Sequence, residues 1–184
     1  MPYHGIELIV IGLCSVIFAF LYTTRLSYLG WGDVLVLIFF GFVPVCGTYY
    51  LQAFSLDAGI LLLSLISGVA IDALLVINNY RDREQDKISG KRTIIVLGGE
   101  RFGQRLYMGI GIVVAILIMV LWMLTGCPTI LLCISIASTY LLLHHAAWRK
   151  MVEINQGKAL NKILGLTSRN MFLMAVLLSL AILV

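Results

Sequence analysis

The sequence predicts an all-α protein, a single domain (1–184) that forms a polytopic bundle of six transmembrane helices. Hydrophobic residues make up 61% of the 184 residues and charged residues 12%, whereas apolar usage in soluble domains is nearer half. Six apolar runs are long enough to cross a bilayer as helices, roughly 17–25 residues each. They are continuously apolar, whereas barrel strands would alternate over about ten residues. The predicted spans are residues 5–22, 33–53, 57–79, 104–125, 128–147 and 168–184.

Basic residues sort the connections between these spans onto two sides of the membrane. All thirteen Lys and Arg residues fall in or beside the loops at 23–32, 80–103 and 148–167, which lie on one side. The positive-inside rule makes that side cytoplasmic, so both ends of the chain are expected to face outward. The sequence therefore predicts a multi-pass protein of the inner (cytoplasmic) membrane, with the lipid bilayer as its partner and no nucleic acid.

The most polar stretch, residues 78–93, holds three acids and five bases and begins where the third apolar run ends. Asn78, Asp82 and Asp86 are spaced by four residues, so they form one stripe if the third span continues as a helix. Two carboxylates one turn apart repel each other, and a cation between them would offset this repulsion. Oxygen ligands of this kind suit Mg²⁺, which usually binds through one or two carboxylates and substrate phosphates.

Three bases, Lys87, Lys91 and Arg92, lie just beyond these carboxylates, and Gly90 permits a tight turn between them. Together with a metal ion they could hold a diphosphate. The alternative interpretation is a solvated cytoplasmic loop that simply obeys the positive-inside rule. That rule requires no Asp at helical spacing, so we favour the diphosphate site.

The string Asn-Asn-Tyr-Arg-Asp-x-x-x-Asp-x-x-x-Gly-Lys-Arg-Thr at 78–93 resembles the second Asp-rich motif of the UbiA superfamily of membrane prenyltransferases. It has the form used by 1,4-dihydroxy-2-naphthoate polyprenyltransferases of menaquinone synthesis. Leu-Tyr-Thr-Thr-Arg-Leu-Ser-Tyr-Leu-Gly-Trp-Gly-Asp at 21–33 is similar to a family loop with a Tyr and a nearby base. Phe-Phe-Gly followed by Gly-Thr-Tyr-Tyr-Leu-Gln, within 39–52, is similar to the next helix.

The resemblance also implies that part of the family fold is missing. Members have nine helices, a cytoplasmic N-terminus and a first motif of the Asn-Asp-x-x-Asp kind, and this sequence has no second acidic motif. The six spans therefore look like helices four to nine. We expect a fragment, a truncated product or one part of a split enzyme, completed by a companion chain that carries the first motif.

The resemblance implies roles for the residues of the central motif. Asp82 and Asp86, with Asn78, would bind Mg²⁺, and Lys91 would join the two carboxylates in catalysis. The diphosphate of a polyprenyl donor would contact the bases Lys87, Lys91, Arg92 and Arg25. The acceptor would be 1,4-dihydroxy-2-naphthoate.

Several other residues leave more than one interpretation open. Tyr22 and Arg25 are typical interfacial anchors, but the resemblance places them against the diphosphate or the aromatic substrate. Asp33 is a weaker candidate for the site, because its position fits an N-cap of the second span equally well. Asp72 lies in the middle of the third span, where a carboxylate is costly, and on a helix it lies within roughly 40° of Asn79. Both could face the substrate cavity.

Two further groups of residues are interpreted from their positions along the predicted spans. Tyr49, Tyr50 and Gln52, near the outer end of their helix, could line a prenyl tunnel or belong to the interfacial aromatic belt. His144 and His145 adjoin basic residues at a helix end and are interpreted as interfacial residues rather than metal ligands.

The leading hypothesis is a Mg²⁺-dependent prenyltransferase. A competing hypothesis is a catalytically incomplete half-site or partner subunit that only binds polyprenyl diphosphate. A more remote one is a small ion-coupled transporter that uses Asp72.

Overall fold

Helices account for the secondary structure in a computed structural model of the chain, which describes residues 5–21, 28, 30–125 and 130–183, and within these residues there is no strand. The prediction of an all-α fold is confirmed. The elements are α1 (Gly5–Leu21), α2 (Gly32–Val36), the π-helix η2 (Leu37–Phe42), α3 (Val43–Ala53), α4 (Ala58–Ile88), α5 (Ile94–Thr125), α6 (Ile130–Ile154), the 3₁₀-helix η3 (Lys158–Leu160) and α7 (Asn161–Leu183).

Five helical segments among the described residues are long and apolar enough to cross a membrane: Gly32–Ala53, Ala58–Ile88, Ile94–Thr125, Ile130–Ile154 and Lys158–Ile182. They correspond to the second to sixth predicted spans, so the protein is a multi-pass membrane protein. The first predicted span corresponds to α1, which has 17 residues and lies at the short end of the range for a transmembrane helix.

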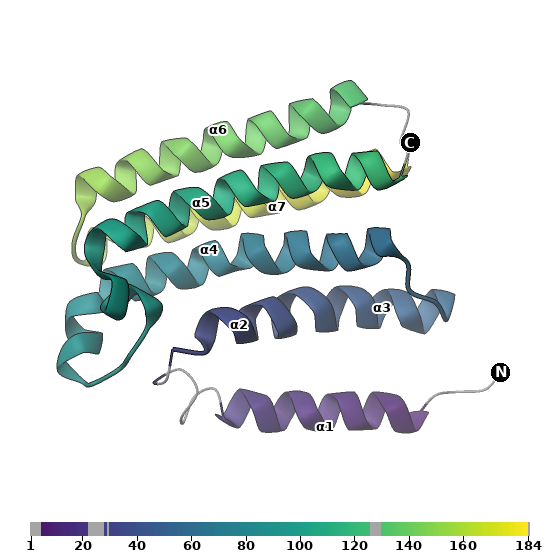
Figure 1. Ribbon diagram of the computed structural model, residues 1–184, viewed down its shortest axis with the longest axis horizontal. Helices are drawn as coiled ribbons and strands as arrows, with labels where there is room; N and C mark the ends of the chain where they lie inside the picture. The colour runs from purple at the N-terminus through teal and green to yellow at the C-terminus, as the bar shows by residue number, and fades with distance from the viewer. Residues whose placement is uncertain (1–4, 22–27, 29, 126–129, 184) are drawn as a thin grey trace.

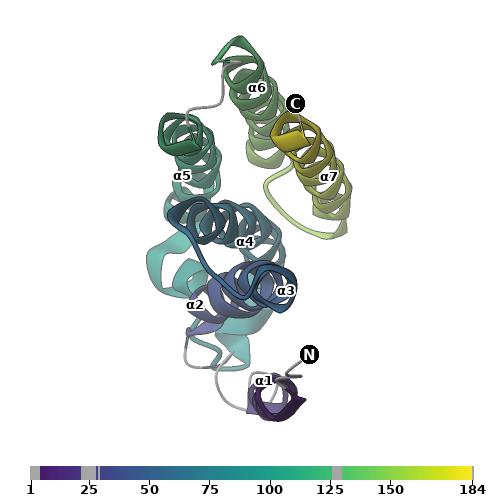
Figure 2. The ribbon, with the colours of Figure 1, turned by 90° about the vertical axis from the view of Figure 1, so that its right-hand side faces the viewer.

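Successive long helices run in opposite directions, so the bundle has two distinct ends (Figure 1). At the left-hand end in Figure 1, α4 ends, α5 begins, and α6 connects through η3 to α7. Viewed along the helices, α4 lies between α2 and α3 on one side and α5 and α7 on the other, with α1 apart from the rest (Figure 2). The polar motif of residues 78–93 therefore meets the connection between α6 and α7 at one end of the bundle.

The second span is a single helical segment whose middle is a π-helix. Pro44 stands at the start of α3, and because proline lacks an N–H group it cannot complete the regular α-helical ladder there. The π-helical segment includes Gly41, where a Cβ atom would lie 2.6 Å from the Ser64 carbonyl oxygen and 2.9 Å from Gly68 Cα. Glycine at this position lets the second span pack closely against α4.

Helices extend beyond the predicted apolar runs at the motif end. The third span was predicted to end at residue 79, but α4 continues to Ile88, so the predicted stripe does lie on a helix. Ahead of the predicted span 104–125, α5 adds a first turn from Ile94 and bends at Gly99, which has φ 79° and ψ −178°. Helical hydrogen bonding does not stop where apolar sequence stops, so hydropathy located the spans but not these helix ends.

The core of the bundle includes one residue that was expected at the interface. His144 is 1% exposed, its ring stacks on that of Tyr107 at 4.2 Å between centroids, and its Nε2 lies 2.7 Å from the Tyr107 carbonyl oxygen. The interfacial interpretation of His144 was wrong. The ring has an internal hydrogen-bond partner and an aromatic neighbour, so its burial is satisfied.

Candidate functional site

Helix α4 carries the central motif from the apolar bundle into a polar region. Asn79 and Tyr80 are 5% and 0% exposed, whereas Glu84 and Gln85 on the following turn are exposed. Ser89 caps the helix and Gly90 follows with φ 76°, which turns the chain toward α5. The motif residues therefore differ in burial according to the face of α4 on which they lie.

Four residues, which we call the Arg81 cluster, join α4 to the start of α7. The Arg81 guanidinium donates through Nε to Asp82 Oδ1 at 2.7 Å and through Nη2 to Asp82 Oδ2 at 2.6 Å. Nη2 also donates to Asn78 Oδ1 at 2.6 Å, and Nη1 donates to Asn161 Oδ1 at 2.7 Å. One cationic group is thus surrounded by the oxygen atoms of Asn78, Asp82 and Asn161.

The Arg81 cluster opens into a polar groove of about 560 Å³ between the end of α4 and the α6–α7 connection. The Asp82 side chain is 33% exposed and that of Arg81 is 23% exposed, so both are accessible from this groove. The groove is lined by Arg81, Asp82, Arg83, Glu84, Gln85, Gln156, Gly157, Lys158 and Asn161.

Asp86 has different surroundings from Asp82. It is 9% exposed as a residue, its Oδ2 lies 3.3 Å from Lys91 Nζ, and its carbonyl oxygen accepts from the Lys91 N–H at 2.9 Å. Asp86 is not among the residues that line the groove. Helical spacing placed Asp82 and Asp86 on one stripe, but in this structure each carboxylate is neutralised by its own base.

Lys87 and Arg92, the two other bases assigned to diphosphate binding, are exposed. The Arg92 backbone N–H donates to the Tyr28 carbonyl oxygen at 2.9 Å, which ties the segment after α4 to the chain before α2. Tyr22 and Arg25, which were also assigned to the site, lie outside the described residues.

A second, smaller cavity lies where the chain before α2, the middle of α4 and the segment before α5 meet. Asn79 reaches it from α4, Asp33 from α2, and Lys91 from the segment that also pairs with Asp86. Asp33 does not cap its helix, because the N-cap is Trp31. The full lining is Gly30, Gly32, Asp33, Leu75, Asn79, Lys91 and Thr93.

Asp72 lies on α4 about two helical turns before Asn79, and 8% of its surface is exposed. Its carboxyl group adjoins that of Asp33, and Oδ1 of each has no hydrogen-bond donor among the residues that the structure describes. Asp72 is thus connected to the small cavity through Asp33.

Arg83, which belongs to the same charged string, lies on the buried side of α4. Its Nη1 donates to the carbonyl oxygens of Tyr80 at 2.8 Å and Asn155 at 2.9 Å, and its Nη2 lies 3.4 Å from Glu100 Oε2. Its guanidinium carbon lies 4.3 Å from the centroid of the Tyr80 ring. We call Arg83, Tyr80, Glu100 and Asn155 the Arg83 cluster; it holds α4 against α5 and the end of α6.

Sequence reasoning missed the residues that the α6–α7 connection brings to the motif. Asn161 contacts Arg81, and Lys158 lines the same groove. Both lie within the predicted loop 148–167, about eighty positions from the motif, and nothing in their spacing indicates the contact. Their polarity in a chain this apolar was the only available signal.

The oxygen atoms of the Arg81 cluster fit a divalent cation. Asn78 Oδ1 and both carboxylate oxygens of Asp82 already converge on a single positively charged group. An amide oxygen, one carboxylate and room for water and phosphate is a ligand set that Mg²⁺ prefers. Within the described residues no group of three or more His, Cys, Asp and Glu side chains gathers as a metal site. Any ion here would need further ligands from a substrate.

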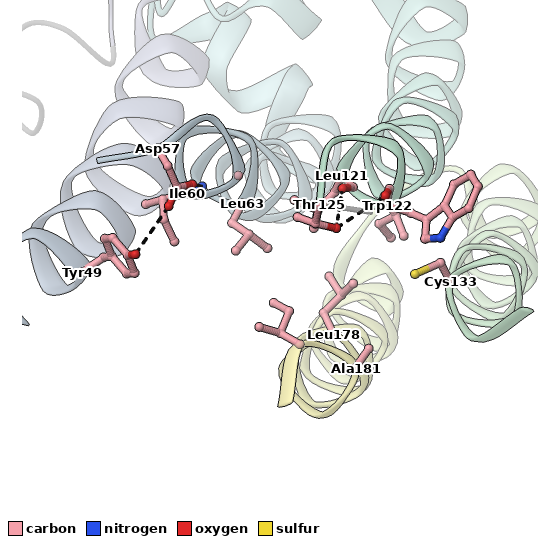
Figure 3. Close-up of a pocket in the computed structure, with 13 residues that line it drawn as sticks. Tyr49, Asp57, Ile60, Leu63, Leu121, Trp122, Thr125, Cys133, Leu178 and Ala181 are labelled. Atoms are coloured by element: carbon pink, nitrogen blue, oxygen red, sulfur yellow. Dashed lines mark hydrogen bonds between the residues drawn. The ribbon is translucent and has the colours of Figure 1, made fainter. Parts of the chain in front are cut away.

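At the opposite end of the bundle lies an apolar cavity of about 420 Å³ (Figure 3). Tyr49 reaches it from α3 and lies 3.4 Å from Asp57 Oδ2, while Leu63, Leu121 and Leu178 come from three other helices. The hydroxyl of Tyr49 therefore has an internal partner, and its ring faces an apolar space. The residues of this cavity are Tyr49, Asp57, Gly59, Ile60, Leu63, Ile118, Leu121, Trp122, Thr125, Cys133, Leu178, Ala181 and Ile182.

The chain is similar to several named membrane prenyltransferases. It is 43% identical over 97 residues to 1,4-dihydroxy-2-naphthoate octaprenyltransferase of Haemophilus influenzae, which is 51% of this chain and 32% of that protein. The enzyme of the same name from Mycobacterium leprae is 36% identical over 122 residues, which is 65% of this chain and 42% of the relative. Human UbiA prenyltransferase domain-containing protein 1 is 35% identical over 91 residues, or 48% and 27%.

The matched stretches thus span between about a quarter and two fifths of the relatives' lengths. No solved structure matches the chain significantly. The model of the UbiA prenyltransferase family matches residues 3–176, which include every described part of the site. Together with the motif at the end of α4 and the multi-pass helical fold, this match shows that the chain belongs to the UbiA prenyltransferase family.

Proposed function

We propose that this chain forms the diphosphate-binding part of an enzyme that transfers a polyprenyl group from polyprenyl diphosphate to 1,4-dihydroxy-2-naphthoate, in menaquinone biosynthesis. The names of the relatives support the choice of donor and acceptor. The observation that carries the proposal is the convergence of Asn78 and Asp82 oxygen atoms on one cation, at the polar mouth of an apolar bundle.

In this proposal Asn78, Asp82 and Asp86 hold Mg²⁺. The ion, when bound, would place positive charge on the diphosphate and make it a better leaving group. Asp82 is accessible from the groove, and Asp86 becomes available if Lys91 moves from its carboxylate to the diphosphate. Asp82, Asp86 and Lys91 are therefore the proposed catalytic residues.

Bases of the motif neutralise the charge that develops as the C–O bond of the donor breaks and its electron pair passes to the diphosphate. Lys87, Lys91, Arg92 and Arg25 are the proposed contacts, and a positive charge fixed near a leaving group stabilises the transition state. The allylic cation that remains is attacked by an electron-rich carbon of the acceptor ring. The acceptor carboxylate leaves as CO₂, so its electron pair restores the aromatic ring.

The remaining proposed contacts are with the organic parts of the substrates. Tyr22, Asn79 and Asp72 would face the acceptor; the cavity that Asn79 shares with Asp33 has a volume of only about 10 Å³, so the acceptor would need these segments to move apart. The apolar cavity at the far end of the bundle would receive part of the prenyl chain and exclude water from it.

We place the motif end of the bundle on the cytoplasmic side of the inner membrane, with α1 beginning and α7 ending on the outer side. The gathering of basic residues at that end supports this orientation.

The test is prenyl transfer by membranes that contain the chain, alone and with a companion segment bearing an Asn-Asp-x-x-Asp motif. Asp82→Ala and Asp86→Ala should each reduce transfer at least about 100-fold without changing membrane insertion. Glu153→Gln, which changes an exposed acid on α6, is the control and should retain activity. Unchanged transfer in both Asp variants would exclude the metal assignment.

The competing proposal is a half-site or partner subunit that binds polyprenyl diphosphate without transferring the prenyl group. It is favoured by the single acidic motif of the sequence, because one such motif offers few ligands for a metal-diphosphate complex. Binding of polyprenyl diphosphate without product, and product only when the companion segment is present, would select this role.

A further inference from the structure

We propose that Arg81 is the counter-cation of Asn78 and Asp82 whenever no divalent cation is bound there, and that it transfers to the diphosphate when a divalent cation takes its place. This inference rests on the proposed function, and it adds Arg81 to the residues that bind the diphosphate. It assigns Lys158 and Asn161 to the opposite wall of the same site.

The first argument is the saturation of the metal-binding oxygens by Arg81. A guanidinium has five N–H donors, and three of those of Arg81 point to Asn78 and Asp82 at 2.6–2.7 Å. Both carboxylate oxygens of Asp82 are used. A divalent cation at these oxygens would compete with the guanidinium, because two cations held against one carboxylate repel each other.

The second argument is the position of the guanidinium at the edge of the groove. Only one further donor of Arg81 is used within the described residues, by Asn161 Oδ1 at 2.7 Å, and the side chain remains 23% exposed. A short movement into the groove would bring the fork toward an anion beside the metal. Guanidinium geometry matches phosphate oxygens in a bidentate manner, so the lost contacts with Asp82 can be replaced.

The third argument is the second wall of the groove. Lys158 and Asn161 come from η3 and the start of α7 and line the groove opposite α4. A diphosphate in the groove would lie between Arg81 and Lys158, whereas the metal would stay on α4. The metal alone therefore competes with Arg81, but the metal together with diphosphate does not.

This arrangement makes metal and diphosphate bind cooperatively. The diphosphate gives Arg81 a new partner, which frees Asp82 for the metal, and by linkage the metal must favour diphosphate binding to the same degree. Removing Arg81 should therefore affect the two ligands in opposite directions. A residue that only stabilises the fold would not produce opposite changes.

The experiment uses the purified chain in detergent micelles and needs no turnover. Mn²⁺ binding is measured from the loss of its free electron paramagnetic resonance signal, and binding of inorganic diphosphate is measured by calorimetry at saturating Mn²⁺. Arg81→Gln is compared with the wild type, with Asp82→Asn, and with Arg105→Gln, which removes an equal charge from an exposed site on α5 outside the groove.

We expect Arg81→Gln to bind Mn²⁺ alone about tenfold more tightly and diphosphate about tenfold more weakly, within the usual range of coupling between sites. Arg105→Gln should change both affinities little. Arg81→Lys keeps the positive charge but lacks the planar guanidinium, so both of its affinities should lie between those of the wild type and Arg81→Gln. If Arg81→Gln binds Mn²⁺ no better than Arg105→Gln, or does not bind it, the inference is wrong.

The Asp82→Asn variant separates this inference from the proposed function. Loss of Mn²⁺ binding in Asp82→Asn, without a gain in Arg81→Gln, would overturn the role of Arg81 and keep the metal site. Full Mn²⁺ binding by Asp82→Asn would overturn the metal site itself.

Discussion

Arg81 and Arg83 stand two positions apart in one charged string on α4, yet their side chains have different burial and different partners. The Arg81 side chain is 23% exposed and contacts the oxygens of Asn78, Asp82 and Asn161 at the edge of a groove. The Arg83 side chain also lines this groove, but it is only 6% exposed and its guanidinium donates to the backbone carbonyls of Tyr80 and Asn155. Residues two apart on a helix point in different directions, so a motif rich in charge can supply a binding site on one face and a structural anchor on another.

The difference lies also in what could replace each arginine's contacts. Around Arg81 the acceptors face a groove, where water, a metal ion or a phosphate can take the place of protein groups. Around Arg83 the acceptors are the backbone carbonyl oxygens of Tyr80 and Asn155, and the guanidinium lies over the buried Tyr80 ring; of its partners, the Glu100 carboxylate is exposed. We therefore expect Arg83, whose contacts have no replacement, to stabilise the fold, and Arg81, whose contacts can be replaced, to be available for ligand binding.

The largest expected effect on stability comes from replacing Arg83, the more buried of the two arginines. Arg83→Ala leaves the carbonyl oxygens of Tyr80 and Asn155 and the carboxylate of Glu100 without their cation. The two carbonyl oxygens each lose a hydrogen bond from a charged donor, which contributes about 1.5–3 kcal/mol, so we expect the free energy of unfolding to fall by about 3–5 kcal/mol. Unfolding by denaturant in micelles measures it, with exposed Arg101→Ala on α5 as the control. Equal stability of the two variants would contradict a structural role for Arg83.

A smaller loss is expected from Tyr80→Phe. The Tyr80 hydroxyl accepts from Gln104 Nε2 at 2.9 Å and donates to Asn155 Oδ1, and Phe removes both contacts at a buried position. We expect a loss of about 1–3 kcal/mol in the same measurement. Tyr49→Phe, whose hydroxyl has a 3.4 Å contact with Asp57, should cost less than Tyr80→Phe. The reverse order would show that the Arg83 cluster does not hold α4 in place.

On the groove side, Lys158→Gln should weaken binding of inorganic diphosphate in the presence of Mn²⁺. One exposed charge contributes about 0.5–1 kcal/mol, which corresponds to a roughly two- to fivefold higher Kd. Calorimetry at two salt concentrations measures it, and the difference from wild type should shrink at high salt. Lys150→Gln on α6, outside the groove, should not change the Kd; an equal effect of both variants would indicate long-range charge alone.

The smallest expected effect is that of Arg81→Gln on the free energy of unfolding, and it compares the two arginines directly. Arg81→Gln should change the free energy of unfolding by less than about 1 kcal/mol, because the contacts of Arg81 are partly exposed and water can replace them. The same unfolding measurement as for Arg83→Ala tests this. A loss as large as that of Arg83→Ala would make Arg81 a second structural anchor.

Hydropathy and spacing predicted much of the fold and the helix that carries the candidate site. Composition was sufficient for a helical membrane bundle, because backbone groups in lipid must be satisfied within helices. The helix through Asn78, Asp82 and Asp86 also agrees with the four-residue spacing. The ends of α4 and α5 did not follow from hydropathy, since their last and first turns are polar.

Contacts between distant segments were beyond the reach of the sequence. Asp82 is paired with Arg81 and Asp86 with Lys91, although spacing alone placed both carboxylates around one ion. His144, expected at an interface, lies in the core because α5 presents it with the Tyr107 ring and carbonyl. These partners are chosen by the packing of helices, which one chain's local pattern does not specify.

By itself, the sequence determined that the protein crosses a membrane, on which helix the charged motif lies, and to which family its motif is similar. Those properties depend on local composition and on periodicity along one helix. Only the tertiary structure decided that Asn161 and Lys158 complete the groove, that Asp33 adjoins Asp72, and that Arg81 and Arg83 have different contacts. The direction in which a side chain meets its partner is set by how helices cross, and that is a property of the whole bundle.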